Sequence, residues 1–198
     1  MFSLQDLLGQ EQGNQAVDQL SQNLGSNHTA VNSAIQMALP LLLSSLAKNA
    51  STPEGAQQLN GAIEQHHDGS LLDNLSSFLG GGIDPQASGQ TNGVGILGHI
   101  LGDNQTQAAQ QVSEKSGLDL GQVTQLLITL APIVMGFLGK QKQQQNLDAG
   151  GLSNWLGGQN EQIQNAPQGG FLSGILDRDG DGSSIDDIAG MAMNYLRK

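Results

Sequence analysis

The chain has 198 residues, of which 37% are hydrophobic and only 3% aromatic, so it can form one compact domain or two small ones with a mainly aliphatic core. Its 18 acidic and 7 basic residues give a formal net charge of −11, and the basic residues form no stripe that could neutralise a phosphate backbone, which excludes nucleic acid from the expected partners. The absence of cysteine excludes disulfides, thiolate metal ligands and a cysteine nucleophile.

The N-terminal stretch MFSLQDLLGQEQG has no positively charged start and only a very short apolar run. It therefore does not resemble a secretory signal. With neither a signal nor an expected membrane span, the cytoplasm is the default location.

Two helices of different character are predicted next. Residues 14–25 predict a short amphipathic helix, because apolar residues recur at the spacing of one helical face: Ala16, Val17, Leu20 and Leu24. Gly25 is placed to end this helix in a left-handed conformation. Residues 31–48, VNSAIQMALPLLLSSLAK, predict a second helix that is apolar nearly all round and carries Pro40 in its interior.

The same pattern returns 92 residues further along the chain. NQAVDQLSQNLG (14–25) aligns with TQAAQQVSEKSG (106–117), and residues 31–48 align with VTQLLITLAPIVMGFLGK (123–140). Nine positions of the first segment match identically: Gln15, Ala16, Gln19, Ser21, Gly25, Val31, Pro40, Leu46 and Lys48. Because the matched Gly, Pro and Lys each mark a structural event, we predict an internal duplication of a helical unit.

A helix that is apolar all round is buried either by protein or by lipid. The most apolar runs here, residues 34–43 and 126–139, fall short of the roughly 20 residues that span a bilayer. We therefore expect both helices to be buried by protein. Two matched kinks, at Pro40 and Pro132, would suit two copies packed against each other.

The regions that follow the two apolar helices predict shorter helices and linkers. An apolar face over residues 71–79 follows a predicted capping box of Ser70 and Asp73, and GGLSNWLGG (150–158) resembles a reduced counterpart of that helix. GGGIDPQASGQTNGVG (80–95) is typical of a linker, as is NAPQGG (165–170). No segment shows the period-two alternation of a strand.

Few residues suggest catalysis. His66 and His67 are neighbours whose side chains point about 100° apart on a helix, so with Asp68 they are interpreted as a solvated helix end. His28 and His99 are interpreted as structural or surface residues. The sequence contains no nucleophile elbow, zinc-protease helix, phosphate-binding loop or dinucleotide fingerprint, and an enzyme is not expected.

The stretch LDRDGDGSSIDDI (176–188) is the one place where residue types and spacing indicate specific chemistry. Asp177, Asp179 and Asp181 occupy positions 1, 3 and 5 of a calcium loop, Gly182 permits the sharp turn, and Ser183 can offer its backbone carbonyl. Three aspartates within five residues concentrate negative charge, which favours a bound cation. We therefore predict one Ca²⁺ ion here.

The second half of this loop departs from the usual pattern. Ile188 stands at position 12, where a bidentate Glu normally closes the site, and the nearest closing carboxylate is Asp187. The rival interpretation is that Ser184 caps the last helix with Asp187 as its capping-box partner. The two interpretations are compatible, because the same helix start can both close a calcium loop and form a capping box. A weak affinity of roughly 10⁻⁵ to 10⁻³ M is expected.

Several of these features together resemble a known family. Two features resemble the YidB-like group of uncharacterised bacterial all-helical proteins. They are the paired apolar helices with an internal Pro and the Leu-Gly segments SFLGGG (77–82), ILGHILGD (96–103) and NWLGG (154–158). LDRDGDG resembles the acidic loops of EF-hand and dockerin-like modules. The resemblance implies a bacterial helical fold and no catalytic residues.

The sequence predicts an all-α fold of two related helical repeats in one bundle, followed by a helix–loop–helix with an acidic loop. The predicted divisions are repeat 1 (1–82), a linker (83–95), repeat 2 (96–160), a linker (161–170) and the calcium module (171–198). The expected function is that of a non-enzymatic interaction or scaffold protein with a structural calcium site, whose partner is another protein or a second copy of the chain. The alternative is a membrane-active protein that inserts its two apolar helices, although a membrane is the less favoured partner.

Overall fold

The computed structural model describes residues 3–81 and 89–165. In these two ranges the chain is helical, without a strand, which confirms the predicted all-α class. The elements are α1 (Leu4–Leu8), α2 (Gln10–Leu24), α3 (His28–Asn49), α4 (Pro53–His66), α5 (Ser70–Asp73), α6 (Leu75–Leu79), α7 (Gly93–Leu101), the 3₁₀ turn η1 (Gly102–Asn104), α8 (Gln105–Ser116), α9 (Leu120–Gln145) and α10 (Ala149–Gln164).

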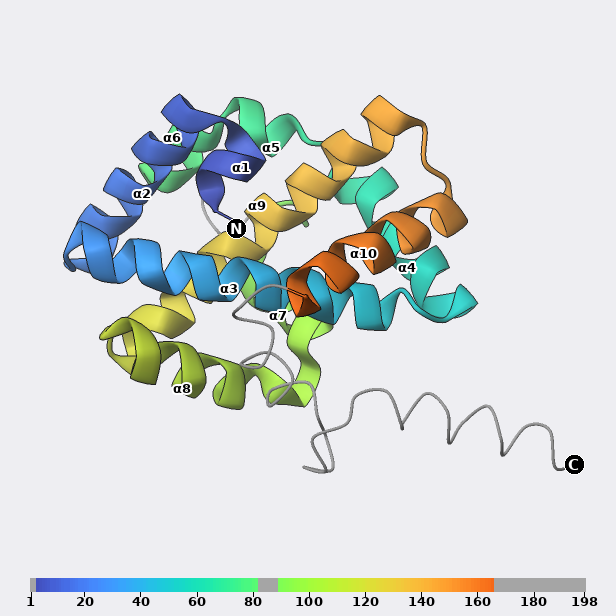
Figure 1. Ribbon diagram of the computed structural model, residues 1–198. Helices are drawn as coiled ribbons and strands as arrows, with labels where there is room; N and C mark the ends of the chain where they lie inside the picture. Colours follow the sequence, from blue (N-terminus) through green and yellow to red (C-terminus); the bar gives the residue numbers. More distant parts are fainter. Residues whose placement is uncertain (1–2, 82–88, 166–198) are drawn as a thin grey trace, which may run out of the picture.

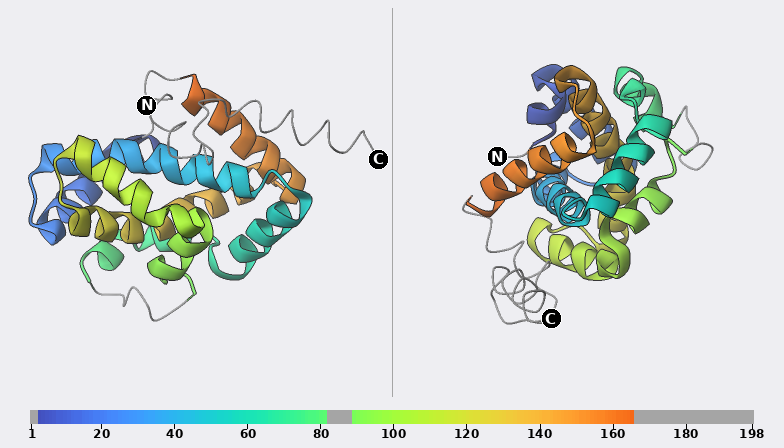
Figure 2. Two further views of the ribbon diagram at one scale, coloured as in Figure 1. Left: turned by 90° about the horizontal axis from the view of Figure 1, so that it is seen from below. Right: turned by 90° about the vertical axis from the view of Figure 1, so that its right-hand side faces the viewer.

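The two long helices α3 and α9 form the centre of the bundle, and the shorter helices pack around them (Figures 1 and 2). Helix α3 contacts α8 and α10 of the second half, and α9 contacts α2, α4 and α5 of the first half. Buried hydrophobic residues from Leu4 to Ile163 belong to one continuous core. The two halves therefore share a single hydrophobic core.

The central helices begin at matching signals. The side chains of Asn27 and Asp119, 92 residues apart, accept hydrogen bonds from the backbone N–H groups of Ala30 and Gln122 and so cap α3 and α9. Gly25 and Gly117 end the preceding helices with φ values of 60° and 79°, as the sequence predicted. A duplicated helix pair would give helix starts and ends that are separated by a constant 92 residues, as these are. The duplication itself stays a prediction.

Both central helices are longer than their apolar runs. Helix α3 has 22 residues and α9 has 26, and both are long and apolar enough to cross a membrane by length and composition alone. In the bundle, 78% and 56% of their most apolar windows are buried by other parts of the protein. Core helices meet the same length and composition criteria, so these criteria do not separate a bundle core from a membrane span.

Several predicted boundaries differ from the structure. Helix α7 begins at Gly93, inside the predicted linker 83–95, because the Asn92 side chain caps it and its apolar face is buried. Helix α10 continues through Ile163, which is buried, so the helix extends into the predicted linker 161–170. Residues 150–158 lie within this helix of 16 residues, and their correspondence to the helix at residues 71–79 stays a prediction.

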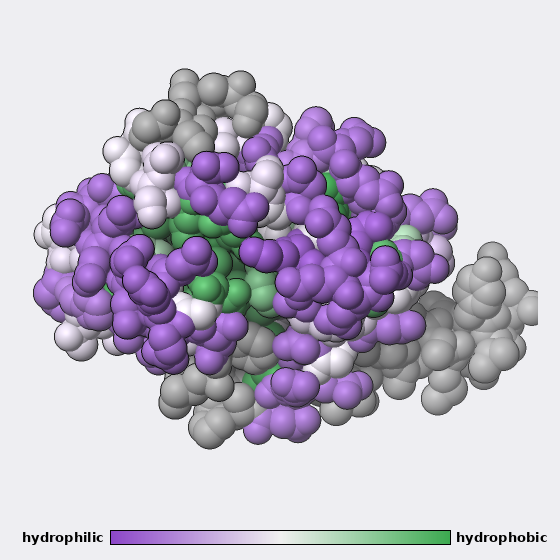
Figure 3. Space-filling view, turned by 90° about the horizontal axis from the view of Figure 1, so that it is seen from above, coloured by the Kyte–Doolittle hydropathy of each residue, from purple (hydrophilic) through white to green (hydrophobic). Residues whose placement is uncertain are grey.

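The surface is mostly polar. Figure 3 shows hydrophilic residues over most of the face seen from above, with a hydrophobic patch in a hollow near its middle. Among the large hydrophobic residues that the structure describes, only Val94 and Leu120 are exposed, at 49% and 42%. Phe137 and Trp155 are partly buried and pack against each other, with ring centroids 6.1 Å apart.

Candidate functional site

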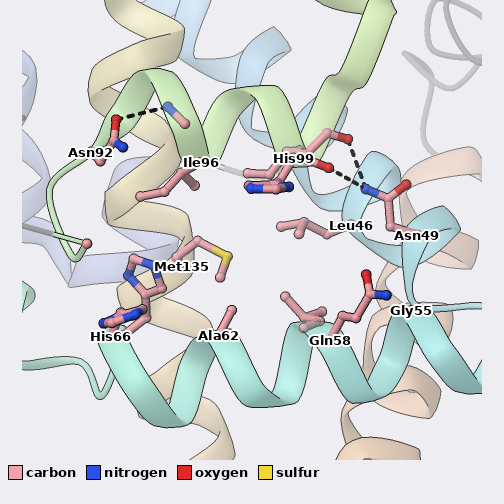
Figure 4. A pocket seen from close by; sticks show the side chains of 15 residues that line it. Leu46, Asn49, Gly55, Gln58, Ala62, His66, Asn92, Ile96, His99 and Met135 are labelled. Carbon is pink, nitrogen blue, oxygen red and sulfur yellow. Dashed lines mark hydrogen bonds between the residues drawn. The ribbon is translucent and has the colours of Figure 1, made fainter.

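A cleft of about 580 Å³ lies between α4 and α7. The end of α3 and one residue of α9 complete its walls. Figure 4 shows α4 along one side and α7 along the other, with Leu46 and Met135 between them. We call this site the α4–α7 cleft. Its volume is within the range of small-molecule binding sites.

The floor of the α4–α7 cleft is apolar. Five buried side chains from four helices form it: Leu46, Leu59, Ile96, Ile100 and Met135. Each is at most 8% exposed and is already packed in the bundle. An apolar surface therefore lies ready in the cleft without rearrangement of the core.

The rim of the cleft is polar. Exposed amide and imidazole side chains surround the apolar floor: Asn49, Gln58, His66, Asn92 and His99. None of the described lining residues is an Asp, Glu, Lys or Arg. In a protein with a net charge of −11, such a lining offers hydrogen bonds and apolar contact without a carboxylate, ammonium or guanidinium group.

Hydrogen bonds and close packing hold α7 in place. The Asn49 side-chain N–H group donates to the backbone carbonyls of His99 and Ile100, at 3.0 and 3.1 Å, and ties α3 to α7 (Figure 4). At the start of α7, a Cβ on Gly93 would overlap the backbone carbonyl oxygen of Ile128 on α9. Glycine at this position thus permits the close approach of the two helices.

His67 is the most unusual residue of the cleft. It follows α4, is only 3% exposed, and its Nδ1 has no hydrogen-bond partner among the described residues. Burial lowers the pKa of His67 to about 4; His66 beside it lowers the pKa further, whereas Asp68 raises it. The imidazole is therefore neutral at pH 7.

The predicted solvated helix end at residues 66–68 is thus only partly correct. His66 and Asp68 are exposed, but His67 is buried because α9 packs directly on its backbone at Gly139, where a Cβ would overlap the carbonyl oxygen of His67. Asp68 has a structural role: its carboxylate accepts hydrogen bonds from the Ser70 backbone N–H and hydroxyl, at 3.0 and 2.6 Å.

These bonds lower the pKa of Asp68 and replace the predicted capping box. The backbone N–H group of Ser70, the first residue of α5, donates a hydrogen bond to the carboxylate of Asp68, and Asp73 does not cap the helix. The prediction of Ser70 with Asp73 was therefore wrong. The predicted apolar face behind it is correct, since Leu71, Leu72, Leu75, Phe78 and Leu79 are all buried.

A second hollow, of about 530 Å³, lies between the ends of α4 and α9 and is charged. Here the Lys142 ammonium is 3.0 Å from the Glu64 carboxylate, and this contact lowers the pKa of Glu64. The Gln143 side chain donates to the backbone carbonyl of Asp68 at 2.8 Å. These groups are paired with one another, which favours a role in joining α4 to α9.

The predicted calcium ligands, Asp177, Asp179, Asp181, Ser183 and Asp187, lie outside the described residues. Within the described ranges, no group of three or more His, Asp or Glu side chains could hold a metal ion. The other two histidines of the sequence analysis are exposed: His28 lies 3.4 Å from the Asp18 carboxylate, and His99 lies on the rim of the cleft.

Sequence reasoning missed the α4–α7 cleft. Its lining residues come from positions 46 to 135, and no motif connects them. The sequence features that could have indicated the cleft were the neighbouring histidines at 66 and 67 and His99 on a short apolar segment. Each of these features also has an ordinary structural explanation. The cleft appears only when the helices are packed.

Comparison with known proteins gives one match. A family model described as "Bacterial protein of unknown function (DUF937)" matches residues 6–141. This range includes every described residue that lines the cleft. No curated protein and no solved structure matches the chain.

Proposed function

The chain belongs to this family of bacterial proteins of unknown function, and from that premise we propose that it is a non-enzymatic binding protein that holds a small uncharged ligand in the α4–α7 cleft. The observation that carries the proposal is the combination of a preformed apolar floor with a hydrogen-bonding rim in which the described residues include no Asp, Glu, Lys or Arg.

The same lining argues against nucleophilic catalysis as the role of this cleft. A nucleophilic mechanism needs a hydroxyl or thiol beside a base. The described lining offers imidazoles and amides but no carboxylate, amine, hydroxyl or thiol. Retention and release of a ligand need none of these.

The test is a titration followed by amide chemical shifts in two-dimensional NMR. The probes are toluene, benzoate and benzylammonium, which share one ring and differ in charge. We expect saturable shifts at Ala62, Ile96 and Ile100 with toluene and much weaker ones with the two ions. Shifts spread over the surface, or equal response to all three probes, would contradict the proposal.

A variant that fills the cleft sharpens this test. Ala62 is partly buried and faces the cleft from α4, so Ala62→Phe should occupy the space and weaken toluene binding at least tenfold (Figure 4). The matched control is Gln57→Phe, on an exposed position of the same helix that does not line the cleft. Equal toluene affinity in both variants would place the binding elsewhere.

A structural calcium site in residues 177–188 is a second proposal and rests on the sequence pattern alone. Calorimetric titration of the full chain with CaCl₂ should give a dissociation constant of roughly 10⁻⁵ to 10⁻³ M. The heat should vanish in the double variant Asp177→Ala/Asp179→Ala and persist in the control Asp103→Ala. Absence of heat in the unmodified chain, or heat unchanged by the double variant, would reject the site.

The scaffold and membrane roles remain predictions. A protein partner or a second copy of the chain would be detected by the mass of the protein in solution. Membrane insertion requires α3 and α9 to leave a core that they share with every other part of the bundle. Flotation with vesicles separates the two, since only an inserting protein would move with the lipid.

A further inference from the structure

The unpartnered Nδ1 atom of His67 gives information about the ligand. Buried polar atoms are nearly always hydrogen-bonded, and a buried polar atom without a partner destabilises a folded protein. His67 lines the α4–α7 cleft and is only 3% exposed, yet no described residue provides a partner for Nδ1. A group that enters the cleft can supply that partner once the imidazole turns toward it.

The chemistry of this imidazole narrows the choice of group. A neutral imidazole carries one N–H donor and one lone pair, so it offers no positive charge to a carboxylate or phosphate. The described rim has no Lys or Arg that would supply one, and the chain is acidic overall. A hydroxyl group suits either form of the ring, because it can both donate and accept a hydrogen bond.

We propose that the ligand of this cleft is an alcohol or phenol, whose hydroxyl group hydrogen-bonds Nδ1 of His67 while its apolar body lies on the floor formed by Leu46, Ile96 and Met135. This inference rests on the proposed function, since it assumes that the cleft is the binding site. It adds the chemical class of the ligand and names the residue that selects it.

The proposed contact requires a small movement of His67. Nδ1 is inaccessible to solvent in this structure, so the proposed binding includes a turn of the imidazole about its Cβ–Cγ bond that presents this atom to the ligand. The neighbouring ring of His66 is exposed, lies edge-on to that of His67, and its centroid is 6.4 Å away. The backbone of His67 stays fixed against Gly139 during this turn.

The experiment compares phenol with toluene, which differ by a hydroxyl in place of a methyl group of similar size. Amide shifts of the full chain should give phenol about a tenfold lower dissociation constant, the size expected for one hydrogen bond to an otherwise unpaired buried group. Phenol, but not toluene, should also shift the imidazole nitrogen resonances of His67.

The variant His67→Leu removes the polar atom and keeps an apolar side chain. It should bind toluene as the unmodified protein does and lose the preference for phenol, whereas His99→Leu on the rim should retain that preference. If toluene and phenol bind the unmodified protein equally, the partner of Nδ1 is water and the inference fails while the proposed function stands. If neither probe reaches the cleft, the proposed function fails with it. The comparison of phenol with toluene uses the unmodified protein, so it tests the inference even if a variant does not fold.

Discussion

Replacement of Gly139 by alanine should lower the free energy of unfolding by about 3–5 kcal/mol, although alanine is the better helix former. Gly139 lies in α9 where this helix crosses the turn between α4 and α5. An added Cβ would overlap the carbonyl oxygen of His67 and lie 2.8 Å from its carbonyl carbon. Both are backbone atoms, which cannot move aside as a side chain can, so the helices must separate.

The matched control is Gly157→Ala in α10. Gly157 is exposed, and a Cβ there would meet nothing within 4 Å. This variant should gain about 0.5–1 kcal/mol from helix propensity. Urea denaturation followed by circular dichroism measures both changes. A Gly139→Ala protein as stable as the unmodified one would mean that α4 and α9 do not meet as closely as described.

The same substitution should also affect the α4–α7 cleft. Because Gly139 fixes the backbone of His67, separation of α9 from this turn would displace the imidazole from the cleft wall. Toluene binding should then weaken in Gly139→Ala and stay unchanged in Gly157→Ala. The stability of the bundle and the shape of the cleft thus depend on one missing side chain.

Much of the fold could be predicted because its signals are local. The apolar spacing of Ala16, Val17 and Leu20 gives a helical face, and the left-handed Gly25 and Gly117 end helices wherever those helices later pack. The boundary errors came from competing local signals. Gly93 was assigned to a linker because glycines surround it, whereas Asn92 caps a helix whose apolar face the core then buries.

The cleft could not be predicted because it depends on contacts between distant residues. His67 and Gly139 are 72 positions apart, and the burial of the histidine follows from the absence of a Cβ on the glycine. The wall of α7 depends in the same way on Gly93 against Ile128 and on Asn49 against Ile100. From the sequence, a glycine in a helix indicates only that the helix is less stable there. It does not indicate which other backbone segment packs against the glycine.

Acid should destabilise this protein earlier than its carboxylates alone would require. The pKa of His67 is about 4 in the folded protein, against an ordinary value of 6.5. Above pH 6.5 the imidazole is neutral in both states, and its contribution to stability is complete. Between pH 6.5 and 4 the unfolded chain binds a proton that the folded protein does not, so the free energy of unfolding falls as the pH falls.

The size and the pH range of this loss can be measured against variants. Water in the cleft screens part of the effect, so we expect a loss of about 2 kcal/mol between pH 7 and 4.5. The pKa values of Glu64 and Asp68 are lowered from 4.5 and 3.8 in the folded protein, so the loss of stability that these carboxylates cause falls mainly below pH 4.5. Urea denaturation at each pH should show a much flatter profile for His67→Leu than for the unmodified chain, with His28→Leu as the control for loss of an exposed imidazole. Parallel profiles for His67→Leu and the unmodified chain would mean that the His67 ring is open to water and can accept its proton in the folded protein.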